Sequence, residues 1–142
     1  MESNRFLFFE KNDTMCKESD KMDCLFCKII EGSIDSFTLY EDEIVKVFLD
    51  AYPDAPGHLL IIPKKHILDL DDMDSNTWNH IFQIIQKMKK RLEEKLHVDG
   101  VTLIQNNGMV QEIKHFHLHM KPYYKEKKEL SKEEVFELLK ED

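Results

Sequence analysis

The stretch Ile113-Lys114-His115-Phe116-His117-Leu118-His119-Met120 decides the interpretation of this chain, because histidines and apolar residues alternate along it. Alternation predicts a β-strand, whose successive side chains point to opposite faces of a sheet. We therefore expect a strand over residues 113–121. Its apolar side chains would face the core, and its three histidines would share the opposite face.

A histidine row of this spacing suits two kinds of chemistry. Alternate histidines on a strand can ligate one metal ion. A neutral imidazole can also attack phosphorus while neighbouring imidazoles donate to the phosphate oxygens, since the histidine pKa lies near physiological pH. The spacing alone leaves both open.

The rest of the chain predicts an α+β domain. Its 142 residues suit one domain, which we expect over residues 22–142, after a disordered or docked N-terminal extension over residues 1–21. Strand patterns lie close together with one long amphipathic helix between them, which favours an antiparallel sheet packed with that helix and with short terminal helices. The predicted elements are a helix over 24–31, strands over 38–40, 44–49, 58–62 and 101–105, the long helix over 75–97 and a last helix that starts after Ser131.

Composition excludes several classes of function. The net charge is −8, so a broad basic surface for nucleic acid is not expected. The longest apolar runs are far shorter than the roughly 20 residues that span a membrane, and the N-terminus lacks the pattern of a signal peptide. We therefore expect a cytoplasmic protein. Its three cysteines include a Cys-x-x-Cys pair, which in that compartment indicates metal binding or redox chemistry.

Several separate motifs together resemble one family. These motifs are Cys24-Leu25-Phe26-Cys27-Lys28-Ile29-Ile30-Glu31-Gly32, Val47-Phe48-Leu49-Asp50, Pro56-Gly57-His58-Leu59-Leu60-Ile61-Ile62-Pro63-Lys64-Lys65-His66, Asn106-Asn107-Gly108 with Gln111, and the histidine run. Their order along roughly residues 23–124 is similar to that of the histidine triad (HIT) family, in particular its Hint-like bacterial branch. The resemblance implies a HIT-like fold.

The resemblance also implies catalytic roles for three histidines. His117 would be the nucleophile that attacks the α-phosphorus of a nucleotide and forms a nucleotidyl-histidine intermediate. His119 would donate to a phosphate oxygen, and His58 would be a fourth histidine beside the row.

The same resemblance implies a nucleotide site. Asp50 would accept hydrogen bonds from the ribose hydroxyls, which suits a carboxylate because it can accept from both. Phe48, Leu25, Phe26 and Ile29 would form an apolar slot for the base, whereas Asn106 and Gln111 would position the phosphate and the leaving group.

Three positions depart from the family pattern. The loop before Gln111 is short, and Glu112 stands where a serine is usual. Lys121 replaces an apolar residue, and Tyr123 replaces a frequent arginine. A carboxylate that faces a phosphate repels it, so Glu112 bears on the identity of the leaving group.

Related bacterial proteins bind a structural zinc ion with two cysteines and two histidines. The matching residues here are Cys24, Cys27, His66 and His115, so the resemblance implies a zinc site that takes the first histidine out of the row. It implies no catalytic metal. It also implies a homodimer in which the sheet continues from one protomer into its partner.

These observations favour a hydrolase or transferase that cleaves purine nucleoside phosphoramidates or adenylates at the α-phosphate. A dinucleoside polyphosphate hydrolase and a mainly non-catalytic nucleotide-binding module are the alternatives. A metalloenzyme with His115, His117 and His119 on one ion is a further rival.

Overall fold

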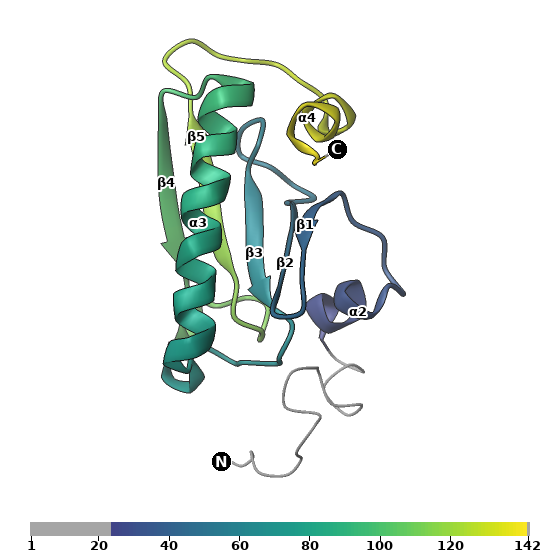
Figure 1. The fold of residues 1–142 in the computed structure, drawn as a ribbon, viewed down its shortest axis with the longest axis vertical. Helices are drawn as coiled ribbons and strands as arrows, with labels where there is room; N and C mark the ends of the chain where they lie inside the picture. The colour runs from purple at the N-terminus through teal and green to yellow at the C-terminus, as the bar shows by residue number, and fades with distance from the viewer. Residues whose placement is uncertain (1–23, 142) are drawn as a thin grey trace.

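The computed structural model describes residues 24–141, and the N-terminal extension predicted over residues 1–21 lies outside them. A five-stranded antiparallel sheet forms the centre, in the order β1-β2-β3-β5-β4. Figure 1 shows the long helix α3 lying along one face of this sheet, with α2 and α4 near its β1–β2 side. The elements are α2 (Leu25–Glu31), β1 (Thr38–Glu41), β2 (Val45–Leu49), β3 (Leu59–Pro63), α3 (Ser75–Leu96), β4 (Gly100–Gln105), β5 (Leu118–Tyr123) and α4 (Lys132–Leu139), with short 3₁₀ turns at Leu70–Asp72 and Gly108–Val110.

The predicted helices form where local chemistry starts and ends them. Asp74 caps the first turn of α3, and α4 begins with a complete capping box between Ser131 and Glu134. Gly32 ends α2 with a φ of 95°, a conformation that costs glycine little. The α+β class, the long helix and the short terminal helices are thus confirmed.

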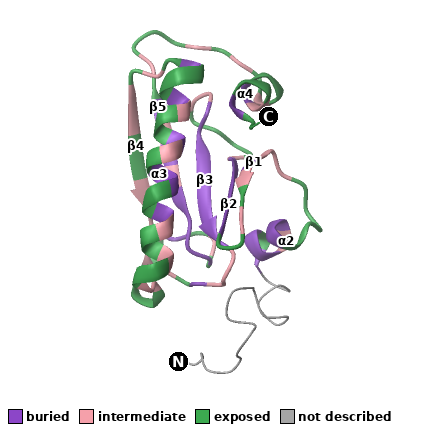
Figure 2. Ribbon diagram, in the orientation of Figure 1, coloured by how far each residue is buried: buried purple, intermediate pink, exposed green. Residues whose placement is uncertain are grey.

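The central strands are buried on both faces, which gives the protein two apolar layers. The larger core lies between the sheet and α3, where buried side chains recur at helical spacing; it also includes Val135 and Leu139 of α4. The smaller layer joins α2 to the opposite face through Phe26, Phe48 and Leu60. Figure 2 shows α3 buried along its inner side and exposed along its outer side. The candidate site therefore lies on the α2 face of the sheet, since Leu60 is the register partner of His119.

The strand predicted over residues 113–121 is wrong in its first half. Pairing with β3 and with β4 ends at Leu118, so within residues 24–141 the residues before it pair with no strand. Two other bonds hold this segment: the Phe116 N–H donates to the Ile67 carbonyl (2.7 Å), and His115 Nε2 bonds the Pro63 carbonyl (2.8 Å). Phe116 is nevertheless fully buried in the core, as the alternation predicts.

No helix in residues 24–141 is long and apolar enough to cross a membrane. The cytoplasmic location and the domain limits of 22–142 remain predictions.

Candidate active site and metal centre

Four predicted site residues from distant parts of the sequence meet on one face of the sheet, over its inner strands. Asp50 follows β2, His58 precedes β3, and His119 lies on β5 beside His117. The His58 and His119 rings approach with Nε2 and Nδ1 3.0 Å apart, and the His117 and His119 ring centroids are 5.1 Å apart. The Asp50 carboxylate lies 3.4 Å from His58 Nε2 and 3.8 Å from His119 Nδ1.

His117 presents one ring nitrogen without a proton. Its Nδ1 lies 2.8 Å from the backbone carbonyl of His115, which can only accept, so Nδ1 carries the hydrogen. In the neutral ring the Nε2 lone pair is then available. Burial lowers the pKa of His117 below its usual value, which favours that neutral ring, although the hydrogen bond to the His115 carbonyl and the charges of Asp50 and Glu112 oppose the shift. This is the arrangement that a nitrogen nucleophile needs.

His58 has the opposite tautomer. The backbone N–H of Asp54 donates to His58 Nδ1 at 3.1 Å, so the proton of neutral His58 lies on Nε2. That Nε2–H faces His119 Nδ1. His119 consequently holds its own proton on Nε2, and burial followed by the neighbouring histidines lowers its pKa to about 4.

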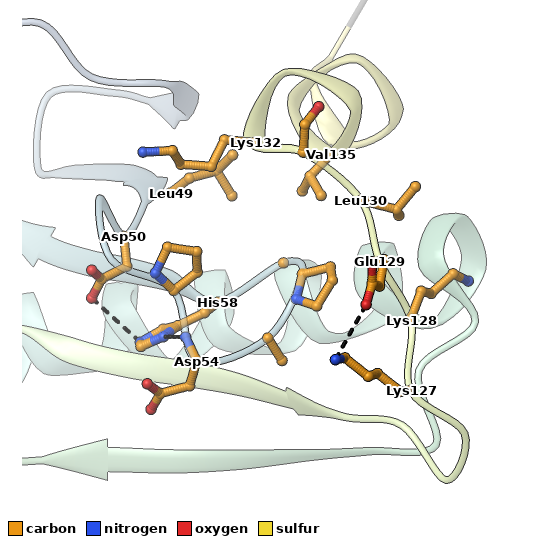
Figure 3. A pocket seen from close by; sticks show the side chains of 15 residues that line it. Leu49, Asp50, Asp54, His58, Lys127, Lys128, Glu129, Leu130, Lys132 and Val135 are labelled. Carbon is orange, nitrogen blue, oxygen red and sulfur yellow. Dashed lines mark hydrogen bonds and ion pairs between the residues drawn. The ribbon is translucent and has the colours of Figure 1, made fainter.

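A cavity of about 540 Å³ adjoins this cluster (Figure 3). Asp50 and His58 form part of its wall, and the C-terminal segment around Lys128 and Lys132 lies opposite. His117 and His119 do not line it. The cavity therefore adjoins the histidine cluster on the side of Asp50 and His58.

Three of the four residues predicted to hold a base lie together on the α2 face. Phe26, Ile29 and Phe48 are buried in the smaller apolar layer, with the two phenyl rings 5.8 Å apart, whereas Leu25 is 42% exposed. The Phe26 ring also meets the His117 ring edge to face, at 4.9 Å between centroids. An apolar wall thus adjoins His117.

The two polar residues predicted to position phosphate are less directly placed. Gln111 is almost fully buried, and its Nε2 donates to the Leu68 carbonyl at 2.6 Å. The Asn106 carbonyl accepts a bond from Gln105, and the neighbouring Asn107 accepts the backbone N–H of Leu70. This hydrogen bonding holds the short loop before the histidine run in place.

Cys24, Cys27, His66 and His115 form a second cluster, whose ligand atoms all lie within 4.8 Å of one another. Nδ1 of His115 is 3.4 Å from Cys24 Sγ and 3.5 Å from Cys27 Sγ, and His66 Nδ1 is 3.1 Å from Cys27 Sγ. His115 donates from Nε2 to the Pro63 carbonyl, which leaves the Nδ1 lone pair facing the sulfurs. A histidine that binds a metal through one ring nitrogen usually donates the N–H of the other to such an acceptor. These four residues could therefore hold a metal ion.

The position of the ring proton argues against a metal ion at the histidine cluster. Asp50, His58 and His119 also offer ligand atoms within 4.8 Å. A metal on His58 Nε2 would move the ring proton to Nδ1, where the Asp54 N–H already points. The rival with all three row histidines on one ion is also disfavoured, because His115 faces the cysteines and His117 Nδ1 bonds backbone.

Fold and site together define a class of small α+β protein with a histidine cluster on one face of a five-stranded antiparallel sheet. The chain belongs to the HIT family: the HIT domain matches residues 31–126.

The relatives agree with this assignment. An uncharacterized HIT-like protein of Methanocaldococcus jannaschii is 43% identical over 105 residues, covering 71% of this chain and 79% of the relative. The adenosine 5′-monophosphoramidase HNT1 of Saccharomyces cerevisiae is 41% identical over 106 residues, covering 73% of this chain and 65% of the enzyme. The crystal structure of a zinc-bound histidine triad family protein from Mycobacterium smegmatis superimposes with a TM-score of 0.77 at 33% identity, covering 84% of this chain and 91% of that one.

Proposed function

We propose that this protein hydrolyses purine nucleoside phosphoramidates or related adenylates at the α-phosphate through a nucleotidyl-histidine intermediate. The observation that carries the proposal is the tautomer of His117, whose hydrogen bond to the His115 carbonyl leaves Nε2 free to attack phosphorus. A similar yeast protein is named an adenosine 5′-monophosphoramidase.

The reaction has two steps. His117 Nε2 forms a bond to the α-phosphorus as the P–N bond breaks, and the nitrogen leaves as an amine with a proton drawn from water. A second water then attacks phosphorus, expels neutral His117 and releases its proton together with the mononucleotide. His119 donates from Nε2 to a non-bridging oxygen, and this bond strengthens as negative charge develops there.

Asp50 and the apolar layer would hold the nucleoside. The carboxylate accepts from the ribose hydroxyls, and the base lies against Leu25, Phe26, Ile29 and Phe48. Burial of a flat ring against such a wall depends mainly on apolar area, so discrimination between bases is expected to be weak. Asn106 and Gln111 orient the phosphate end, with the Gln111 side chain acting through the backbone to which it is bonded.

The intermediate itself is the test. Protein mixed with adenosine phosphoramidate and quenched in acid-free denaturant within the first turnover is expected to gain the mass of one adenylyl group on the peptide that contains His117. Adduct on another residue, or turnover without any adduct, contradicts the proposed mechanism. A parallel assay with a dinucleoside polyphosphate ranks the alternative substrate class. Tight mononucleotide binding without turnover of either substrate would support the non-catalytic alternative.

We further propose that the metal at the second cluster is structural zinc. For tetrahedral zinc with Zn–S of about 2.3 Å and Zn–N of about 2.0–2.1 Å, each S···N separation is about 3.5–3.6 Å. The three sulfur–nitrogen distances of 3.1–3.5 Å lie close to that value. The Cys27 sulfur is part of a disulfide bond in this structure, and zinc binding therefore requires its reduction to a thiolate.

We also propose a homodimer, because the outer edge of β4 and exposed apolar side chains offer a surface for a second copy of the chain. β4 ends the sheet order, so one row of its backbone groups lacks a neighbouring strand among the described elements. Trp78 and Phe82, four residues apart on α3, are 36% and 50% exposed, and Leu103 on β4 is 49% exposed. A partner that extends the sheet would cover these side chains.

Substituting Phe82 by glutamate is therefore expected to turn the dimer into a monomer, because a carboxylate would be buried without a counter-charge. Sedimentation velocity measures the change from two 17.0 kDa chains to one. Leu138→Glu, at a similarly exposed apolar residue of α4, is the matched control and keeps the dimer. A monomeric wild type would reject the proposal.

A further inference from the structure

An ion pair that the family pattern does not anticipate stands at the edge of the histidine cluster. Lys121 Nζ lies 2.7 Å from the Asp54 carboxylate. Lys121 lies on β5 two residues after His119, so its side chain leaves the same face of the strand. Asp54 belongs to the loop between β2 and β3, and Figure 3 shows it against His58. The pair thus ties this loop to the strand that carries the donor histidine.

The backbone of Asp54 contacts the histidine cluster. The Asp54 N–H donates to His58 Nδ1 at 3.1 Å. That donor leaves neutral His58 with its proton on Nε2, where it faces His119 Nδ1 at 3.0 Å. His119 then keeps its proton on the outward Nε2. One backbone N–H therefore determines the proton positions of two histidines.

Other contacts of the loop between β2 and β3 set the path of its backbone but do not hold the Asp54 side chain. The His58 N–H donates to the Ala55 carbonyl (3.0 Å), and the Tyr52 N–H donates to Asp50 (2.8 Å). Gly57 turns the chain with a φ of 97° against Leu96. The Asp54 side chain is 62% exposed, and its bond to Lys121 holds it toward β5.

We propose that Lys121 is a positioning residue: through its ion pair it holds the Asp54 N–H on His58 and so fixes the tautomers of His58 and His119. The tautomers are properties of the protein alone. Their value for catalysis, a donor proton on His119 Nε2 aimed at phosphate, rests on the proposed function.

Charge acting through space is the competing explanation, and it makes a different prediction. The Lys121 charge lowers the pKa of both His58 and His119, whereas the Asp54 charge raises that of His58. The charges of Asp50 and His117 also act on this pair. By charge alone, removing Lys121 and removing Asp54 would move the His58 pKa in opposite directions. By positioning, both removals change the tautomer in the same direction.

The experiment uses ¹⁵N-labelled full-length protein without substrate, with long-range ¹H–¹⁵N spectra of the imidazoles near neutral pH. We expect wild-type His58 and His119 as Nε2–H tautomers. In Lys121→Met and Asp54→Ala the preference of His58 for that tautomer falls about tenfold, the loss of one hydrogen bond. The Asp54 side chain is exposed and that of Lys121 is half-buried, and amide spectra establish that both variants keep the fold.

Two further variants complete the test. Lys121→Arg preserves the ion pair and is expected to keep the wild-type tautomers. Lys89→Met removes a lysine from the Glu93 ion pair on α3 and is the matched control. A wild-type tautomer in Lys121→Met or in Asp54→Ala, or a loss in Lys121→Arg, overturns the proposal. None of these readouts requires hydrolysis, so they stand even where the proposed function fails.

Discussion

Replacing His117 by alanine is expected to lower the turnover of adenosine phosphoramidate by about 10⁴-fold or more, since removal of a nucleophile abolishes the covalent route. A loss of that size corresponds to about 5.4 kcal/mol of transition-state stabilisation. No neighbouring group can substitute. The nearest imidazole, His119, has Nδ1 facing His58 and a proton on Nε2.

The loss of turnover should differ between the residues of the site. Asp50 and the apolar layer do not depend on the His117 ring, so we expect the variant to bind adenosine monophosphate within a few-fold of the wild type. His119→Ala removes one donor to the phosphate and is expected to cost about 10²–10³-fold, the range for a single oxyanion donor. The larger loss in His117→Ala than in His119→Ala distinguishes a nucleophile from a group that only stabilises charge.

Single-turnover kinetics and calorimetry measure the two effects separately. His97→Asn is the matched control, because it removes an exposed histidine at the end of α3 whose φ of 55° asparagine tolerates. His117→Gly should recover part of its rate when imidazole is added, as the free ring can occupy the vacated space. Turnover by His117→Ala within tenfold of the wild type would place the nucleophile elsewhere.

The sequence predicted the members of the site better than their bonding. Alternation points to His117 and His119, the resemblance to the HIT family adds His58, and the three side chains do come together. The two cysteines of the Cys-x-x-Cys pair likewise meet His66 and His115. These side chains meet because short motifs fix which side chains are available, and the antiparallel sheet then places β2, β3 and β5 side by side.

The sequence could not predict contacts made by the backbone. Asp54 acts on His58 through its N–H, which every residue except proline possesses, so its side chain gives no indication of the role. Strand alternation extended β5 too far, because it cannot show where the neighbouring strands end. Lys121 was noticed only as a departure from a pattern, and its partner lies 67 positions away in the loop after β2.

Loss of the zinc site is expected to have the largest effect on stability. Cys24→Ala should remove one bound zinc per chain and lower the free energy of unfolding by about 3–5 kcal/mol, as losses of structural metals are among the largest single-residue effects. For a 142-residue chain this corresponds to a fall in Tm of about 10–15 °C. The magnitude follows from position: the ligands join α2 to the segment before β5, which has no strand beside it.

The same substitution should also reduce activity, although Cys24 is not expected to touch substrate. The His115 side chain is a proposed zinc ligand, and its backbone carbonyl accepts the Nδ1–H of His117 at 2.8 Å. Loss of the proposed zinc would loosen the His115 carbonyl, which fixes the tautomer of His117, the proposed nucleophile. We expect turnover below the melting transition to fall by about tenfold to a hundredfold, the usual range when a group that orients a site is lost, while the mononucleotide affinity changes little.

Elemental analysis and thermal unfolding of reduced protein test both effects. Cys16→Ala is the matched control, because this third cysteine is outside the proposed ligand set, and it should keep one zinc and the wild-type Tm. Removing zinc from the wild type with a strong chelator should reproduce the Tm of Cys24→Ala, and adding zinc back should restore only the wild type. If Cys24→Ala keeps its zinc, the four-ligand assignment fails. If it loses zinc without a change in Tm, the metal binds but does not hold α2 to the histidine run, and the structural role is rejected.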